Sequence, residues 1–406
     1  MQTKLAPFIS DTSAGREAQG ILGRCVHCGF CTATCPTYQL LGNELDGPRG
    51  RIYLIKSMLE GTACSKSTLL HLDRCLTCRS CETTCPSGVE YGRLLEIGRQ
   101  VAEKAVPRPI SRRLGRRLLA WFLTSGLFPV LLGWGRSVRR LCPESVARYI
   151  PVRYAVGENP SAVRSRQMIV LEGCVQPALS PNINAAAARV LDRLGISLIR
   201  ASEAGCCGAL ALHLSIEDRA RQAMRRNIDA WWPLLEAGAE CIVMTASGCG
   251  VTVKEYGQVL ADDSQYAEKA KRVSSLTWDL SEILLREPMT ASLAGRGVSV
   301  AVQTPCSLQH GQGINGSIEE ILSRVGFQQA TVENPHLCCG SAGSYSILQS
   351  SIAKRLRQDK LTALQAGGPN VIATANVGCQ VHLAAKSTVP VRHWIELVDS
   401  AMQLND

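Results

Sequence analysis

The first residues of the chain lack the apolar stretch that directs a protein to secretion. Residues 1–20 are largely polar and contain no cleavage-site pattern, so we expect no secretory leader. Disulfides rarely persist in the reducing compartment that this expectation implies. The chain nevertheless has 19 cysteines in 406 residues. Many stand at short fixed spacings, which indicates bound metal rather than disulfides.

Acidic residues are missing from residues 104–143, which contain nine lysines and arginines. Nucleic acid is the first partner to consider for a chain with a formal charge of +10. These basic residues flank an uncharged apolar run at 118–134, so we expect no nucleic-acid partner. The run has 17 residues, short of the roughly 20 that span a bilayer. We expect a helical hairpin on an anionic membrane surface or a segment packed on other domains or a partner subunit, with a transmembrane helix as the further alternative.

A complete Gly-x-Gly-x-x-Gly dinucleotide fingerprint is also absent, so we expect this chain to hold no flavin. No set of residues that would clamp a substrate carboxylate is evident, and we expect no catalytic residue here. Cysteine spacing and composition divide the chain into four predicted domains. They are a cysteine-rich domain at residues 1–104, a basic and apolar connector at 105–165, and two related units at 166–290 and 291–406.

The two C-terminal units repeat one cysteine pattern. Its members are Cys174, Cys206, Cys207 and Cys249 in the first unit, and Cys306, Cys338, Cys339 and Cys379 in the second. Corresponding cysteines lie 132 residues apart for the first three pairs and 130 for the last. Such regularity indicates a duplicated unit.

Short apolar runs alternate with helical segments in both repeats. The expected strands cover residues 168–171, 196–200, 241–245, 298–302 and 371–374, and the expected helices cover 182–194, 216–235, 318–325 and 350–365. This alternation favours parallel α/β units.

The N-terminal domain contains two complete Cys-x2-Cys-x2-Cys-x3-Cys-Pro runs. They consist of Cys25, Cys28, Cys31, Cys35 and Pro36, and of Cys75, Cys78, Cys81, Cys85 and Pro86. Both match the bacterial ferredoxin spacing, so we predict two [4Fe–4S] clusters. Structural zinc, the alternative, uses pairs of Cys-x2-Cys without the third cysteine and the Cys-Pro ending. The space between the runs leaves room for a helical insert at residues 49–72 in a mostly helical domain.

The fourth cysteine of each run binds the other cluster in two-cluster ferredoxins. One cluster is therefore predicted to take Cys25, Cys28, Cys31 and Cys85, and the other to take Cys75, Cys78, Cys81 and Cys35. His27 lies inside the first loop and is expected outside the ligand set, because four cysteines are available.

The eight repeat cysteines are candidates for a further metal or redox site. Each repeat can gather four thiols at the ends of its strands, where sites occur in open α/β sheets. Buried inert thiols and a strained vicinal disulfide are the alternatives for the adjacent pairs Cys206-Cys207 and Cys338-Cys339.

Several stretches resemble the iron–sulfur subunits of bacterial glycolate oxidases. They are residues 25–38 (CVHCGFCTATCPTY), 45–52 (LDGPRGRI), 72–75, 172–174, 204–208, 245–250 and 391–395. The wider kinship includes the C-type iron–sulfur component of anaerobic glycerol-3-phosphate dehydrogenases, lactate-utilisation proteins and heterodisulfide reductases. The resemblance implies an α-helical ferredoxin domain followed by duplicated α/β cysteine-rich units with a Cys-Cys-Gly signature.

The resemblance also implies a role in an oxidoreductase complex. An FAD-containing partner subunit would oxidise glycolate to glyoxylate, and this chain would pass the electrons towards a membrane quinone. The complex would lie peripherally at the cytoplasmic face of the inner membrane.

One departure keeps an alternative open. The heterodisulfide reductases close each repeat with Cys-x-x-Cys, whereas Ala246 and Asn376 stand at the first of those positions here. This speaks against the noncubane cluster of those relatives and leaves a further conventional cluster, or none. The alternative function is a thiol or disulfide reductase with a catalytic cluster at the repeat cysteines.

Overall fold

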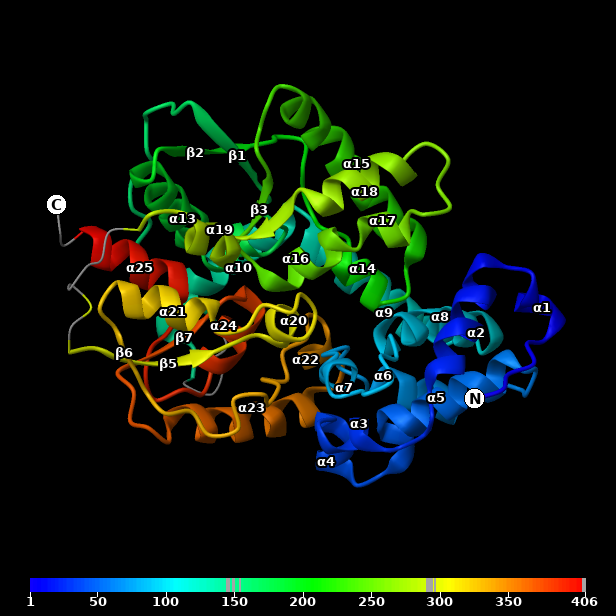
Figure 1. Cartoon of the computed structure of the whole chain (residues 1–406). Helices are drawn as coiled ribbons and strands as arrows, with labels where there is room; N and C mark the ends of the chain where they lie inside the picture. Colours follow the sequence, from blue (N-terminus) through cyan, green and yellow to red (C-terminus); the bar gives the residue numbers. More distant parts are fainter. Residues whose placement is uncertain (144–146, 148–149, 153–154, 290–294, 296, 404–406) are drawn as a thin grey trace. The chain divides into compact units, whose positions relative to one another are not determined.

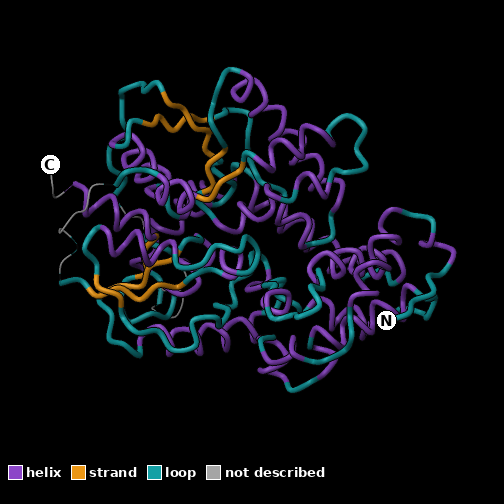
Figure 2. The backbone as a smooth tube through the Cα atoms, viewed as in Figure 1, coloured by secondary structure: helices purple, strands orange, loops and turns teal. Residues whose placement is uncertain are grey.

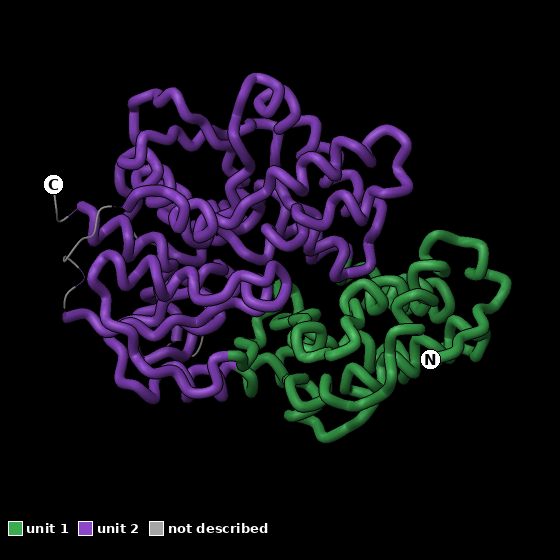
Figure 3. The backbone as a smooth tube through the Cα atoms, viewed as in Figure 1, with its two compact units in different colours: residues 1–116, 336–356 green, residues 117–335, 357–406 purple. Residues whose placement is uncertain are grey.

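The computed structural model describes residues 1–143, 147, 150–152, 155–289, 295 and 297–403. The chain forms two compact units (Figure 3). Unit 1 comprises residues 1–116 and 336–356, and unit 2 comprises residues 117–335 and 357–406. The predicted boundary between the repeats, at residues 290 and 291, lies outside the described residues. The division into four domains stays a prediction.

Unit 1 consists of helices and loops, with no strand among its described residues (Figure 2). The helices are α1 Pro7–Ser10, α2 Ser13–Arg24, α3 Phe30–Ala33, α4 Pro36–Leu41, η1 Glu44–Asp46, α5 Pro48–Leu59, α6 Lys66–Asp73, α7 Ser80–Thr83, α8 Tyr91–Ala105 and α22 Tyr345–Leu348. Apolar side chains of α2, α5, α6 and α8 form the core. Helices α5 and α8 approach closely at Gly98, where a Cβ would lie 2.6 Å from Cγ1 of Ile55.

The second piece of unit 1 comes from the second repeat. Residues 336–356 include Cys338, Cys339 and α22. Tyr345, at the start of α22, donates a hydrogen bond from Oη to the carbonyl oxygen of Arg74 at 2.9 Å. The two residues are 271 positions apart, so unit 1 is complete only when this late segment joins it.

Unit 2 contains two four-stranded parallel sheets with equivalent strand orders, β2-β1-β3-β4 and β6-β5-β7-β8 (Figure 1). The strands are β1 Arg166–Val170, β2 Ile196–Arg200, β3 Ile242–Met244, β4 Thr277–Asp279, β5 Ser299–Gln303, β6 Gln328–Gln329, β7 Val371–Thr374 and β8 Val391–His393. Equal strand order confirms the predicted duplication. The predicted fold class, a helical region followed by two parallel α/β units, is confirmed as well.

Helices cover the sheets of unit 2. They are α12 Gln176–Leu179, α13 Asn182–Arg193, α14 Ala209–His213, α15 Glu217–Glu236, α16 Ser247–Lys254, α17 Tyr256–Val259, α18 Ala267–Ser275, α19 Leu280–Arg286, α20 Cys306–Gln309, α21 Ser317–Arg324, α23 Ser350–Gln365, α24 Val377–Ala384 and α25 Trp394–Gln403; α23 begins in unit 1. Helix α13 packs on α25, and α19 packs on α21. Equivalent helices of the two repeats therefore make the same contact in both directions, and the repeats share one core.

The predicted strands are present as β1, β2, β3, β5 and β7, and the predicted helices as α13, α15, α21 and α23. The insert expected at residues 49–72 is helical, as α5 and α6. The sequence does not predict β4, β6 and β8, which have only two or three residues each.

The apolar run of the connector forms two helices. Helix α9, Ile110–Thr124, begins in unit 1 and ends in unit 2; α10, Leu127–Val138, is followed by η2, Arg139–Leu141. Nowhere in the described ranges does a single helix have the length and apolar composition to cross a membrane. The helices at 110–124 and 127–141 meet that requirement only as a pair, which is bent by 79°.

Candidate metal centres

The two cysteine-rich loops of unit 1 share one backbone conformation. His27 and Thr77, at equivalent positions, both have a φ of 57°, and Gly29 and Arg79 have φ values of 86° and 60°. The latter pair precede α3 and α7, which carry the third cysteine of each run. Glycine adopts this left-handed conformation freely, whereas a residue with a side chain loses about 1–2 kcal/mol. Arg79 therefore adopts a left-handed backbone conformation that its side chain disfavours, because the loop requires it.

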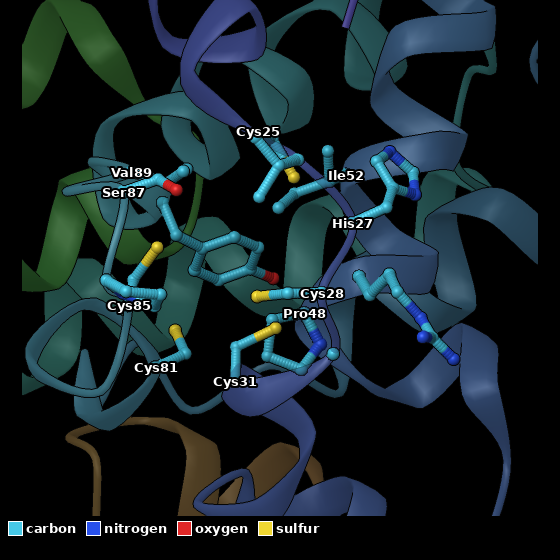
Figure 4. Close-up of a pocket in the computed structure, with 15 residues that line it drawn as sticks. Cys25, His27, Cys28, Cys31, Pro48, Ile52, Cys81, Cys85, Ser87 and Val89 are labelled. Atoms are coloured by element: carbon cyan, nitrogen blue, oxygen red, sulfur yellow. The ribbon is translucent and has the colours of Figure 1, made fainter.

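The first thiol set consists of Cys25, Cys28, Cys31 and Cys85. These residues line one pocket together with Cys81, and Figure 4 shows sulfur atoms of both runs turned towards it. Burial raises the pKa of Cys31 to about 11, and the nearby thiolates of the other three members add to the shift. Thiolates that repel one another in this way stay ionised together only around a cation.

The second thiol set consists of Cys35, Cys75, Cys78 and Cys81. All but Cys78 are buried. Burial raises the pKa of Cys81 well above its usual value, and the other three members, together with Glu82, raise it further. The third cysteine of each run thus has as neighbours the three cysteines predicted to share its cluster. The assignment of ligands to clusters stays a prediction.

Hydrogen-bond donors surround Cys75 in the second thiol set. The backbone N–H of Thr77 lies 3.4 Å from its Sγ, and Oη of Tyr91 donates to the same sulfur at 3.7 Å. Nη2 of Arg99 donates to the carbonyl oxygen of Cys75 at 2.9 Å. Donors to ligand sulfur stabilise the added negative charge of a reduced cluster.

A buried cation lies beside the second thiol set. Arg51 is 1% exposed; its Nη2 donates to Oγ1 of Thr37 at 3.1 Å, and that oxygen lies 3.3 Å from Sγ of Cys35. Nε of Arg51 donates to the carbonyl oxygen of His71, and Oδ1 of Asp46 lies 3.7 Å from Nη2. Burial alone would lower the pKa of Arg51, but its neighbours, the second-set thiolates and Asp46 among them, raise it.

The donors of unit 1 fit iron–sulfur cubes better than single ions. Within the described ranges, no group of three or more histidine, cysteine, aspartate or glutamate side chains is arranged to hold a metal ion. A single zinc ion needs its sulfur ligands at about 2.3 Å. The four thiolates of a [4Fe–4S] cube each bind a different iron and so stand further apart. Two sets of four thiols meet that requirement in number and in chemistry.

The four cysteines of the first repeat lie together in unit 2. Hydrogen bonds between side chains join Cys174 to Cys206, Cys206 to Cys207, and Cys207 to Cys249. The thiols of Cys174 and Cys207 lower the pKa of Cys206, and the backbone N–H of Gly208, 3.5 Å from its Sγ, acts in the same direction. The lowered pKa of Cys206 favours a thiolate beside the thiols of Cys174 and Cys207, whose pKa values are raised, and such a group is suited to redox chemistry.

The glycine of each Cys-Cys-Gly signature is required by packing. Gly208 and Gly340 have φ values of 93° and 80°. A Cβ on Gly208 would lie 3.1 Å from the carbonyl oxygen of Ala220, and one on Gly340 would lie 2.7 Å from that of Ala353. Only glycine combines the left-handed turn with so close an approach to a helix backbone.

The second repeat is divided between the units. Cys338 and Cys339, both buried, belong to unit 1, whereas Cys306 and Cys379 belong to unit 2. The four-cysteine site expected in this repeat stays a prediction.

The two residues that replace cysteine have other roles. Asn376 precedes α24 and accepts a hydrogen bond from the backbone N–H of Gly378 at 2.8 Å, as a helix N-cap. Ala246 occupies the equivalent position before α16 and is buried. Neither side chain can ligate a metal through sulfur.

Sequence reasoning did not single out Arg51, Tyr91 or Tyr345 as part of the site. The stretch LDGPRGRI contains Arg51, but only the fold places that residue beside cysteines of both runs. Tyr345 could not be found from local spacing, because its partner Arg74 is remote in sequence.

Comparison with known protein families matches three parts of the chain. Residues 21–89 match the family described as 4Fe-4S dicluster domain. Residues 168–254 and 300–384 each match the family described as cysteine-rich domain, with the short name CCG. The first match supports iron rather than zinc in unit 1, and the second agrees with the duplicated sheets.

Similar proteins extend over the whole chain. The glycolate oxidase iron-sulfur subunit of Escherichia coli strain K12 is 52% identical over 99% of this chain and 100% of its own length. The chain belongs to the family of glycolate oxidase iron–sulfur subunits. A probable member from Bacillus subtilis strain 168 is 28% identical, covering 91% of this chain and 89% of its own. Lactate utilization protein A of the same organism is 24% identical, covering 56% of this chain and 96% of its own.

Membership of this glycolate oxidase subunit family makes the chain part of an oxidoreductase and implies electron transfer. The resemblance expected from the cysteine runs and the Cys-Cys-Gly signatures is confirmed.

Proposed function

We propose that the chain carries electrons from an FAD-containing partner subunit, which oxidises glycolate to glyoxylate, towards a membrane quinone. Glycolate gives up two electrons and two protons to the flavin, and the quinone takes up two of each. Two [4Fe–4S] clusters, when bound, accept and release the electrons one at a time. The observation that carries the proposal is the pair of thiol sets in unit 1, together with family membership.

The ligands proposed for the first cluster are Cys25, Cys28, Cys31 and Cys85, and those for the second are Cys75, Cys78, Cys81 and Cys35. The cysteines that raise the pKa of Cys31 and of Cys81 are in each case the other three members of its proposed set, which supports this crossing. Cys28 is exposed, so the first cluster would lie near the surface, within reach of another subunit. The second thiol set, buried and rich in donors, would hold the inner cluster.

The proposed location is the cytoplasmic face of the inner membrane, as a peripheral protein. The supporting observation is the basic, acid-free stretch from residue 104 to residue 143, because anionic headgroups attract such a segment. A quinone acceptor dissolved in the bilayer requires the complex to approach it.

The test is glycolate-dependent reduction of a soluble quinone by the complex co-expressed with its flavin subunits. Replacing Cys28 by Ser removes one ligand of the first cluster, and we expect turnover to fall by about tenfold or more. The matched control is Cys64→Ser, a half-buried cysteine outside both thiol sets, which should keep full activity and the full EPR signal. Undiminished quinone reduction by Cys28→Ser would refute the proposal.

A second candidate function is a thiol or disulfide reductase that uses the first repeat. The observation in its favour is the lowered pKa of Cys206, because a half-buried thiolate is a nucleophile. The isolated holo-chain with a one-electron donor would then reduce a small disulfide, and Cys206→Ser would abolish that reduction. Failure of the unmodified chain to turn over any disulfide would leave electron transfer as its function.

A further inference from the structure

Helix α9 exposes a continuous apolar stripe. Its members follow one another at intervals of four, four and three residues and therefore lie on one face of the helix: Ile110, Leu114, Leu118 and Trp121. All four are exposed, from 49% at Trp121 to 83% at Ile110. In the described part of α9 only Ala120 is buried. A helix that served only to pack the protein would bury this stripe.

Helix α10 and the turn η2 repeat the arrangement. Their exposed stripe consists of Leu127, Val130, Leu131, Trp134, Val138 and Leu141, and the structure gives α10 no buried residue. The two stripes contain half of all large apolar side chains that are exposed among the described residues. Single exposed apolar residues are ordinary, but a concentration of this kind marks a binding surface.

The charges around the stripes have one sign. Arg112, Arg113 and Arg117 are exposed before the uncharged run, and Arg140 is exposed after it. No acidic residue occurs from 104 to 143. An anionic partner with an apolar interior therefore fits the segment, since it satisfies both the arginines and the stripes.

Side-chain hydrogen bonds also hold α10 and the end of α9 to other parts of unit 2. Arg136 of α10 donates from Nη1 and Nη2 to the carbonyl oxygens of Ala178 and Leu179, both at 2.9 Å. Arg219 donates from Nη2 to Oγ1 of Thr124, at the end of α9, at 2.8 Å. These bonds fix the α9–α10 segment on the polar side and leave its apolar stripes uncovered.

We propose that the α9–α10 segment, residues 110–141, binds the surface of an anionic lipid bilayer. The stripes enter the boundary between headgroups and acyl chains, Trp121 and Trp134 lie at the interface, and the exposed arginines contact anionic headgroups. The bend of 79° between the helices suits a segment that lies along a surface. The inference deepens the proposed function and rests on it only for the location of the quinone.

The experiment is flotation of the holo-protein with lipid vesicles. One set contains phosphatidylglycerol and phosphatidylcholine, the other phosphatidylcholine alone. We expect strong binding to the anionic vesicles, weakened by salt. The double variant Trp121→Ser/Trp134→Ser and the triple variant Arg112→Gln/Arg113→Gln/Arg117→Gln should each bind about tenfold or more weakly, because the first loses the rings at the interface and the second loses attraction to the headgroups. The matched control is Val152→Ser/Val163→Ser, which removes exposed apolar residues outside the segment and should bind normally.

Two further measurements separate a failure to bind lipid from misfolding of a variant and from a failure of the proposed electron transfer. Brominated lipid should quench tryptophan fluorescence of the unmodified protein, which needs no variant to fold. Glycolate-dependent reduction of a water-soluble quinone should be unchanged in both multiple variants, so failure of that activity tests the proposed function separately. Equal binding of all proteins to both vesicle types, no binding at all, or loss of the flavin subunits from the variants with vesicle binding retained would each overturn the inference.

Discussion

Arg51 shows how one side chain can set the properties of a cluster site. It is the buried cation beside the second thiol set, and its hydrogen bond to Thr37 brings its charge close to Cys35. Arg49, two residues earlier, lies near the first thiol set but is 39% exposed and pairs with Glu44. Water and salt screen an exposed charge far more than a buried one. The two proposed clusters should therefore differ in how strongly a cation favours their reduced states.

Replacing Arg51 by Gln should lower the reduction potential of the second cluster. A reduced cluster carries one more negative charge, and the variant loses the cation that stabilises it. We expect a reduction equilibrium about tenfold less favourable, or about 59 mV for one electron. An EPR-monitored redox titration measures both clusters, and Arg51→Lys should recover most of the shift.

Arg49→Gln is the control for this prediction, with both potentials expected to stay within a few millivolts of the unmodified protein. An equal shift of both clusters in Arg51→Gln, with full iron content, would show that the residue acts on the whole unit and not on the second site.

At the scale of elements, His393 connects the two sheets of unit 2. It ends β8, is fully buried, and donates from Nε2 to the carbonyl oxygen of Thr245, just after β3, at 3.0 Å. Its Nδ1 accepts from the backbone N–H of Ile395. Burial lowers the pKa of His393 to about 3, so the folded protein holds the neutral ring at physiological pH.

The buried, neutral ring of His393 predicts that the stability of the protein depends on pH. The unfolded chain takes up a proton on His393 below a pKa of about 6.5, whereas the folded chain does not until about pH 3. Stability is therefore lost as the pH falls through the unfolded value, by about 1.4 kcal/mol between pH 7.5 and 5.5. His393→Gln cannot titrate, and its urea midpoint should lack this component. Parallel loss in both proteins over that range would contradict the assignment to His393.

Elements with strong local signals could be predicted from the sequence, and short ones could not. Strands β1, β5 and β7 contain runs of buried apolar residues, and α13 and α15 show clear helical periodicity. Strand β6 has two exposed residues, Gln328 and Gln329, and is defined only by pairing with β5. No local pattern marks such a strand.

The candidate site divides in the same way. The spacing of the cysteine runs predicts the three close ligands of each thiol set, because these are local in sequence, and the assignment of the fourth stays a prediction. The cation at Arg51 and the hydrogen bond from Tyr345 depend on residues brought together by folding. Their identities are ordinary, and only their burial beside the cysteines gives them a role.

At the scale of the whole molecule, the two units differ in how they are stabilised. The core of unit 1 includes Cys25, Cys75 and Cys81 among its buried residues, so proposed cluster ligands form part of its interior. Unit 2 has two separate apolar cores around its sheets. Cluster binding should therefore contribute to the folding of unit 1 more than to that of unit 2.

Removal of iron should unfold unit 1 and leave unit 2 folded. After anaerobic chelation we expect amide hydrogens in residues 1–116 and 336–356 to exchange quickly, while those of β1, β3, β5 and β7 keep their protection. Hydrogen exchange followed by mass spectrometry measures this peptide by peptide. Reconstitution with iron and sulfide is the control and should restore protection. Uniform loss of protection across both units would contradict separate stabilisation.

The late segment of unit 1 also has a consequence for biosynthesis. A ribosome that has completed residue 116 must add 219 more before it reaches residue 336, which takes roughly 10 to 45 s at typical elongation rates. During that interval the nascent ferredoxin unit lacks Tyr345, which later donates to the carbonyl oxygen beside Cys75. Unit 1 therefore completes its packing only near the end of synthesis, although the eight cysteines of both runs are made early.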